Sequence, residues 1–266
     1  MKKAKVFRPT AFAFPYLAIT LVFVIVPLLL LLVYSLIGTD GNFSTEHFIY
    51  VFTKLDFMPK MLKTIGIAAL STAICLLIAY PVAYILSSAP FNKMAILTLL
   101  FIIPMWINFT LRIFALQSVL GVIGIKESLT AVVIGMVYDF FPYMLLPIYT
   151  VLSNMDKSYV EASKDLGANG IKTFFKVTLP LSFPGIMSGI SMMFMPIFSS
   201  YAITEMMGDT GTSVIGATIA AFFEQDSYGR GSALSFVLLI IVIAVMLIGT
   251  FLSGRSVKAS KGVANK

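Results

Sequence analysis

The sequence has a single cysteine and a single histidine, Cys75 and His47. Because Cys75 lies within an apolar segment, the chain has no disulfide framework and no thiolate metal site. The sequence also contains no phosphate-binding loop, no zinc-binding helix motif and no Ser-His-Asp set. We therefore expect no catalytic residues, no bound metal and no cofactor, which argues against an enzyme.

Charged residues are scarce as well. They make up 12% of the chain, whereas hydrophobic residues make up 59%, and the mean hydropathy of +0.96 is far above that of a soluble domain. These values exclude a soluble protein with one core and predict an all-α integral membrane protein. The net charge is +7, but in a membrane protein the distribution of basic residues across the two sides is what matters, so nucleic acid is not an expected partner.

Six apolar runs are each about 20 residues or longer, enough for a helix to cross the ~30 Å hydrocarbon core of a lipid bilayer. They cover about residues 12–37, 64–88, 95–120, 129–152, 184–206 and 231–253. The basic N-terminal segment resembles the start of a signal peptide, but the run behind it is too long, so we interpret it as a retained span. With no internal repeat, residues 1–266 are predicted to form a single transmembrane domain.

Basic residues predict the orientation of the six spans. If the N-terminus is inside, the inner segments hold Lys2, Lys3, Lys5, Arg8, Lys93, Lys157, Lys164, Lys172, Lys176, Arg255, Lys258, Lys261 and Lys266. The outer segments hold only Lys54, Lys60, Lys63, Lys126 and Arg230. We therefore expect both termini and the loop 153–183 to be cytoplasmic, and the polar loops 38–62 and 207–230 to lie outside.

The stretch 161–180 is a polar island between apolar runs. Its charged residues, which keep it out of lipid, are Lys164, Asp165, Lys172 and Lys176. Asp156 or Ser158 can cap a short helix from about Tyr159 to Leu166, and Gly167 suits its C-terminal stop. A second short helix can follow over about 170–177. A loop that only reconnects two spans needs neither helix, so we expect this one to dock another protein; the alternative is an amphipathic loop lying on the membrane.

A glutamate, a glycine and a Leu-Pro pair are spaced through this loop as Glu161-Ala162-Ser163, Gly167 and Val177-Thr178-Leu179-Pro180. The pattern resembles the EAA loop of ABC-importer permeases, with Ser163 in place of the second alanine and Val177 in place of isoleucine. The resemblance implies a type I ABC importer permease fold whose coupling helix sits in a groove of a cytoplasmic ATPase dimer. The coupling residues it implies are Glu161, Ala162, Ser163, Asp165, Gly167, Leu179 and Pro180.

Two further stretches are similar to polyamine-importer permeases. They are Ile103–Arg112, which contains Pro104, Trp106 and Asn108, and residues 135–149. The likeness covers nearly the whole chain. It implies a bacterial cytoplasmic-membrane protein that works with a second permease subunit and an extracytoplasmic polyamine-binding protein, and that carries a small cation such as spermidine or putrescine.

Other functions stay open at this point. Permeases for thiamine, iron or phosphonates share many of the same sequence features. An integral membrane enzyme would need convergent catalytic groups, and a stand-alone channel would not need a docking loop. An ATPase that copurifies with the chain would separate an importer from both.

Three ionisable residues lie inside the apolar runs: Arg112, Asp139 and Glu205. Such groups are costly in a membrane unless they are paired or hydrated. Arg112 lies late in its run, near the outer boundary, where it could snorkel. Asp139 lies about ten residues into its run, which is about 15 Å deep by helix rise. Glu205 follows Tyr201 by one turn and shares its helix face.

Acidic and aromatic side chains along a path suit a cationic cargo, because a carboxylate replaces part of the lost hydration and aromatic faces attract the charge. The candidate path residues are Trp106, Asn108, Tyr138, Asp139, Tyr201 and Glu205. The resembled family places an acid at the position of Glu205 but usually an apolar residue at that of Asp139. Separately, the spacing of Gly185 and Gly189 predicts close helix contact near the cytoplasmic end.

Overall fold

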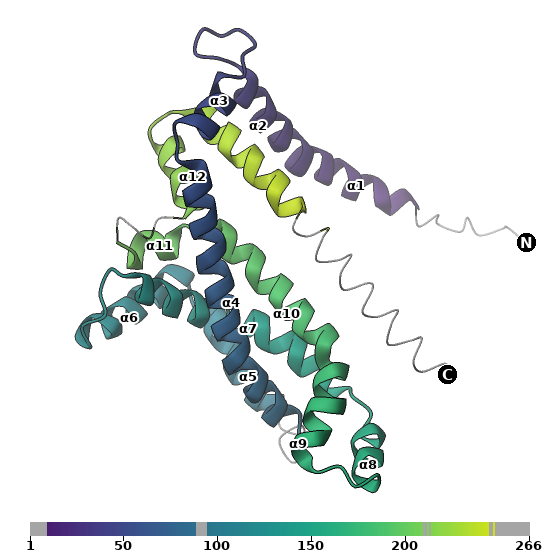
Figure 1. The fold of residues 1–266 in the computed structure, drawn as a ribbon. Coiled ribbons are helices and arrows are strands. Elements are labelled where there is room, and N and C mark those ends of the chain that lie inside the picture. The colour runs from purple at the N-terminus through teal and green to yellow at the C-terminus, as the bar shows by residue number, and fades with distance from the viewer. Residues whose placement is uncertain (1–9, 89–94, 210–211, 213, 245–246, 248–266) are drawn as a thin grey trace, which may run out of the picture. The chain divides into compact units, whose positions relative to one another are not determined.

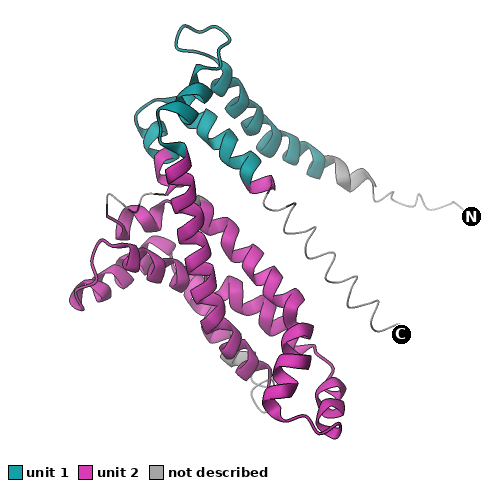
Figure 2. Cartoon of the chain, viewed as in Figure 1, with its two compact units in different colours: residues 1–57, 219–241 teal, residues 58–218, 242–266 magenta. Residues whose placement is uncertain are grey.

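The computed structural model describes residues 10–88, 95–209, 212, 214–244 and 247 (Figure 1). These residues form helices and connecting turns without a strand, apart from an isolated antiparallel bridge between Ile37 and Phe43. The predicted all-α class is confirmed. The chain divides into two compact units, residues 1–57 with 219–241 and residues 58–218 with 242–266 (Figure 2). Each unit is described separately, and the single domain expected over 1–266 stays a prediction.

The first unit is built on the N-terminal span. α1 (Thr10–Thr20), η1 (Leu21–Ile25) and α2 (Val26–Leu36) run on from one another, and α3 (Glu46–Thr53) follows a short loop. α3 packs against the helix Tyr228–Ala244: Phe48 meets Phe236 edge-on at 6.5 Å between ring centroids, and the Arg230 guanidinium lies 4.1 Å from the ring centroid of Tyr50. The predicted outer loop 38–62 therefore contains a helix.

The second unit has its core where α7 (Leu129–Ser153) packs along α10 (Leu179–Ser199) (Figure 1). Met144, Ile148 and Met193 are fully buried. A β-carbon on Gly189 would lie 2.8 Å from the sulfur of Met144, and one on Gly185 would lie 2.9 Å from a backbone carbonyl oxygen of α7. Small residues thus let the two backbones approach closely, as the glycine spacing predicted.

Two π-helical turns precede prolines. η1 ends before Val26-Pro27, and η4 (Phe174–Thr178) ends before Leu179-Pro180. Proline lacks an N–H and clashes with the carbonyl four residues earlier, and the wider π turn makes room for it without ending the helix. One helix therefore runs from Gly170 to Phe198. The expected short helix over 170–177 is the first part of this helix. The fifth span, predicted to start near residue 184, thus belongs to a helix that begins earlier.

In the part of the chain that the structure describes, four helices are long and apolar enough to cross a membrane: Pro15–Leu36, Phe57–Ser87, Leu129–Ser153 and Gly170–Phe198. A bent pair, Leu99–Trp106 with Phe109–Val122, makes a fifth if it is one span. Tyr228–Ala244 is shorter, and the rest of the predicted sixth run lies outside the described residues apart from Leu247. The structure is compatible with six crossings, which stay a prediction.

The predicted third span is broken more sharply than expected. α5 (Ala95–Ile102) and η3 (Ile103–Trp106) meet α6 (Phe109–Val122) at 105°. Pro104 weakens the first helix, and Asn108 starts the second, because its side chain accepts hydrogen bonds from the N–H groups of Thr110 and Leu111. The elbow redirects the chain between Trp106 and Phe109.

The region after α10 contains two short helices. α10 ends at Ser199, the backbone at Ser200 is extended, and α11 (Ala202–Met207) is a separate helix, so the fifth run does not continue unbroken to 206 as expected. α12 (Ile215–Glu224) lies within the predicted loop 207–230. Within the second unit, the N–H of Ile215 donates to the Thr64 hydroxyl of α4 (Phe57–Ser87) at 3.0 Å, which fixes the start of α12 to α4.

Candidate functional site: the α8 loop and the α6–α7–α11 cluster

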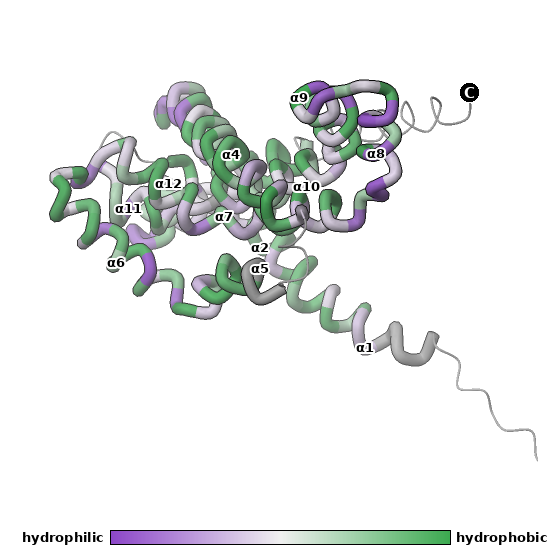
Figure 3. The backbone as a smooth tube through the Cα atoms, turned by 90° about the horizontal axis from the view of Figure 1, so that it is seen from below, coloured by the Kyte–Doolittle hydropathy of each residue, from purple (hydrophilic) through white to green (hydrophobic). Residues whose placement is uncertain are grey.

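The first candidate site is the loop that contains α8 (Ser158–Asp165). Several residues of this loop are hydrophilic (Figure 3). The Asp156 carboxylate accepts a hydrogen bond from the Ser158 N–H at 2.9 Å, and this bond lowers the pKa of Asp156. The helix ends at Asp165, and Gly167, two residues later, has a φ of +77° in the left-handed region. The predicted short helix, its cap and its glycine stop are therefore confirmed.

The two parts of the loop are tied together. The Asn169 side chain accepts from the Lys172 N–H at 2.9 Å and so caps α9 (Gly170–Thr173). The hydroxyl groups of Ser163 on α8 and Thr173 on α9 lie 3.0 Å apart. Because η4 and α10 continue α9, this contact connects α8 to the long apolar helix Gly170–Phe198.

An aromatic contact joins the same loop to α4. The Phe174 ring lies edge-on to Tyr80 and Tyr84, with centroid distances of 5.8 and 5.5 Å. The Tyr80 hydroxyl also hydrogen-bonds the Ser182 hydroxyl of α10 at 2.8 Å, and both groups are buried. The loop is thus fixed to two membrane-spanning helices, α4 and α10.

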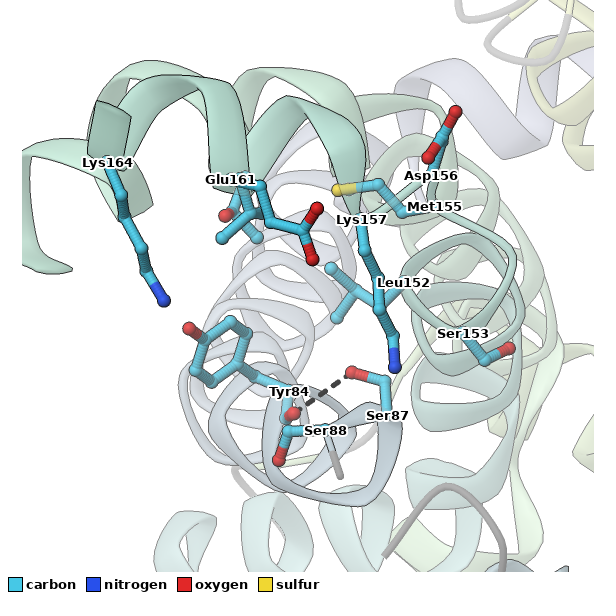
Figure 4. A pocket seen from close by; sticks show the side chains of 12 residues that line it. Tyr84, Ser87, Ser88, Leu152, Ser153, Met155, Asp156, Lys157, Glu161 and Lys164 are labelled. Carbon is cyan, nitrogen blue, oxygen red and sulfur yellow. Dashed lines mark hydrogen bonds between the residues drawn. The ribbon is translucent and has the colours of Figure 1, made fainter. Parts of the chain in front are cut away.

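A cavity of about 290 Å³ opens beside α8 (Figure 4). Lys157, Glu161 and Lys164 line it from the loop, while Tyr84 and Ser87 line it from the end of α4. Among the described residues, none of these three charged side chains forms an ion pair.

The second candidate site lies where α6, α7 and α11 meet, and its central feature is an ion pair. Arg112 on α6 and Asp139 on α7 are paired, and their side chains are only 9% and 6% exposed. The charge of Asp139 is thereby compensated within the chain, and Arg112 does not snorkel as it could have done near the outer boundary. The sequence identified both residues as embedded charges, but their pairing was not predicted. Their opposite signs in neighbouring apolar runs could have suggested the pair.

α11 contains the ionisable candidate Glu205, and the aromatic candidate Tyr201 directly precedes this helix. The Glu205 N–H donates to the Tyr201 carbonyl at 2.9 Å, which confirms the single turn between them. Tyr201 is 42% exposed and Glu205 is also exposed, whereas Ile203, Thr204 and Met207 are buried. The two candidate path residues therefore share the exposed face of α11.

The remaining candidates lie apart from α11. Trp106 at the elbow is 87% exposed, and Asn108 is occupied with capping α6. Tyr138 lines a cavity of about 260 Å³ together with Arg112, Phe101 and Phe141. The structure thus places the six path residues at the elbow between η3 and α6, on α7 and at α11, with Tyr138 exposed and the adjacent Asp139 buried.

Comparison with known proteins identifies the family. A family model described as "Binding-protein-dependent transport system inner membrane component" matches residues 5–259. The chain belongs to this family. It is therefore a multi-pass inner-membrane protein, the membrane component of a transport system that depends on a binding protein.

Relatives with assigned functions match most of the chain. The "Spermidine/putrescine transport system permease protein PotB" of Haemophilus influenzae is 30% identical over 250 residues, covering 85% of this chain and 87% of its own length. The PotB protein of Escherichia coli is 28% identical over 250 residues, covering 85% of this chain and 90% of its own length.

Solved structures match the fold. A bacterial ABC transporter involved in the import of the acidic polysaccharide alginate gives a TM-score of 0.74 at 14% identity, covering 92% of this chain and 94% of that one. The inward-facing MetNI methionine ABC transporter gives a TM-score of 0.60 at 15% identity, covering 73% of this chain and 93% of that one. The expected fold of an ABC importer permease is confirmed.

Proposed function

We propose that the chain is the permease subunit through which an ATP-driven importer translocates polyamines across the bacterial cytoplasmic membrane. The observation that carries this proposal is the match to two spermidine/putrescine permeases over 85% of the chain. The alternative is a permease for another small solute, of the thiamine, iron or phosphonate type. Measurements of cargo uptake distinguish this alternative from a polyamine permease.

The α8 loop is the proposed contact with the ATPase. Its helix is capped by Asp156 and stopped by Gly167, and Glu161 has no ion partner among the described residues. ATP is hydrolysed in a separate cytoplasmic subunit dimer, because this sequence contains no phosphate-binding loop. The proposal puts the α8 loop in the cytoplasm, and the basic residues that favour the inner side support a cytoplasmic location for this loop and for both termini.

Alternating access follows from the way the loop is attached. Closure of the ATPase dimer displaces α8, the Ser163–Thr173 bond and the Phe174 contacts pass the movement to α10 and α4, and the spans shift between two packings. A second permease subunit completes the pore, and an extracytoplasmic polyamine-binding protein releases cargo into it. This chain supplies one half of the path.

Glu205 is the proposed carboxylate for the cargo. It is exposed beside Tyr201, whereas Asp139 is already neutralised by Arg112. A carboxylate and an aromatic face suit an ammonium group. Since a polyamine carries several ammonium groups, further acidic groups come from the partner subunit.

Substitution of Glu205 by Gln tests the cargo contact. A hydrogen bond to a charged group contributes roughly 1.5–3 kcal/mol, so Glu205→Gln should raise the half-saturating polyamine concentration by about tenfold or more. Glu224→Gln, at an exposed carboxylate that ends α12, is the matched control and should change nothing. Normal uptake by Glu205→Gln at normal surface abundance would refute this contact.

A further inference from the structure

The helix that carries Glu205 is too short to hold its own orientation. α11 has six residues, which is fewer than two helical turns, so its own backbone hydrogen bonds do little to fix the direction of its axis. The direction in which Glu205 points therefore depends on the elements against which the buried face of α11 packs. Those elements are α6, the turn before α7, and α7 itself.

Side-chain and backbone donors hold the C-terminal end of α11. The Gln117 amide of α6 donates to the Met206 carbonyl at 2.5 Å, and the Ser128 N–H donates to the Met207 carbonyl at 3.1 Å. The last carbonyls of a helix have no partner within it, so these two bonds fix the end of α11. Met206 directly follows Glu205 in the chain.

α7 supplies a matching depression for the same helix. A β-carbon on Gly135 would lie 2.7 Å from the sulfur of Met207 and 3.0 Å from a methyl carbon of Ile203. Both of these α11 side chains are fully buried. The absence of a side chain at Gly135 therefore lets α11 seat on α7 with Tyr201 and Glu205 on its opposite, exposed face.

The Arg112–Asp139 pair joins the two helices on which α11 rests. Asp139 lies one turn beyond Gly135 on α7, and Arg112 precedes Gln117 on α6. A buried charge without its partner is strongly unfavourable, so the pair holds α6 against α7. The elbow at Asn108 sets α6 at 105° to the preceding helix. The Arg112–Asp139 pair is therefore an important contact for the placement of α6.

We propose that Gln117 and the Arg112–Asp139 pair are positioning residues that aim Glu205 at the cargo. Asp139 then acts through α6 and α11 and does not itself touch the cargo. The proposal rests on the assignment of Glu205 as the cargo carboxylate. It gives a role to Asp139, which stands where the resembled family usually has an apolar residue.

The decisive variant is Gln117→Leu, measured as polyamine uptake by the assembled complex. Losing one hydrogen bond should raise the half-saturating concentration about three- to tenfold, with the maximal rate and surface abundance unchanged. Gln117→Asn, which keeps an amide, should recover part of the loss. Ser118→Ala is the matched control and should leave uptake unchanged, because the exposed Ser118 hydroxyl donates to the Phe114 carbonyl of its own helix and bonds no other element among the described residues.

Combination with Glu205→Gln separates positioning from a general structural effect. If Gln117 acts through the Glu205 carboxylate, the double variant should be no worse than Glu205→Gln alone. Additive losses would overturn the proposal, and so would normal half-saturation in Gln117→Leu while Glu205→Gln is impaired. Normal uptake by Glu205→Gln alone would instead refute the cargo contact on which the proposal rests.

A charge swap examines Asp139. Arg112→Asp and Asp139→Arg should each lower surface abundance, and the combined swap should restore abundance and half-saturation to within about threefold. Restored abundance with half-saturation still raised tenfold or more would show that Asp139 contacts the cargo and would overturn its positioning role. If the swapped chain is not produced, the Gln117 variants decide the proposal.

Discussion

The hydroxyl groups of Ser163 and Thr173 lie 3.0 Å apart and join α8 to α9 across the turn at Gly167. Ser163 stands where the resembled EAA loop has its second alanine. Thr173 is only 4% exposed, so an alanine at position 163 would leave its hydroxyl without this partner. The departure from the motif therefore strengthens the loop in which it occurs.

Ser163→Ala should loosen the α8 loop. A neutral hydrogen bond contributes about 0.5–1.5 kcal/mol, so amide exchange over residues 158–173 should accelerate roughly two- to tenfold. Thr173→Val should act similarly, and the double variant should add little, because one bond is lost in each case. Unchanged exchange in both single variants would show that the bond does not hold the loop.

Gly167→Ala should strain the end of α8. A residue with a β-carbon pays about 1 kcal/mol or more in the left-handed region that Gly167 occupies, although no atom obstructs it. Association of the complex with its ATPase, measured by copurification, should fall while membrane insertion stays normal. Gly170→Ala is the control, since that position is equally open and has no positive φ. Equal behaviour of the two variants would contradict the strain at Gly167.

Protonation of Asp156 should release the start of α8. The hydrogen bond from Ser158 lowers the pKa of Asp156 in the folded chain, so the stabilisation is present above the ordinary pKa of about 3.9 and is lost as pH falls through the lowered value. Hydrogen-exchange protection of the Ser158 amide should fall over that range. Asp156→Asn keeps an acceptor and should remove the pH dependence, whereas Asp156→Ala should expose the amide at every pH. A pH profile for Asp156→Asn identical to that of the unaltered chain would contradict the assignment.

Gly189→Ala should destabilise the contact between α7 and α10. The added β-carbon would lie 2.8 Å from the Met144 sulfur and 3.0 Å from its carbonyl oxygen, and such overpacking costs typically about 1–3 kcal/mol. Gly66→Ala in α4 is the control, because nothing lies within 4 Å of that position, and it should be neutral or stabilising. Thermal unfolding in detergent measures both; a lower melting temperature for Gly66→Ala alone would contradict the packing.

The sequence was most informative where the chemistry is local. The cap, the stop at Gly167 and the close contact at Gly185 and Gly189 each depend on a few neighbouring residues and were predicted, and the structure selects Asp156 over Ser158 as the cap. The separation of α11 from α10 occurs inside an apolar run, and periodicity does not report the packing that accompanies it. The elbow has local signals in Pro104 and Asn108, but these residues alone do not predict that α6 turns by 105°.

Pairing across helices was the other feature that the sequence did not reveal. Arg112 and Asp139 were both identified as embedded charges, yet nothing in their spacing says that α6 and α7 bring them together. Gln117 carried no signal at all, because an amide in an apolar run is recognised as a positioning group only when the carbonyl it meets is known. The candidate path residues and the coupling residues themselves stay predictions.

Uptake of labelled spermidine and putrescine by cells lacking the chain, compared with the same cells carrying it, tests the account most directly. The chain should restore uptake of labelled polyamine, a Glu161→Lys variant should restore little, and excess unlabelled polyamine, but not thiamine, should compete. If cells with the complete transport complex take up no more polyamine than cells without the chain, the proposed cargo is wrong.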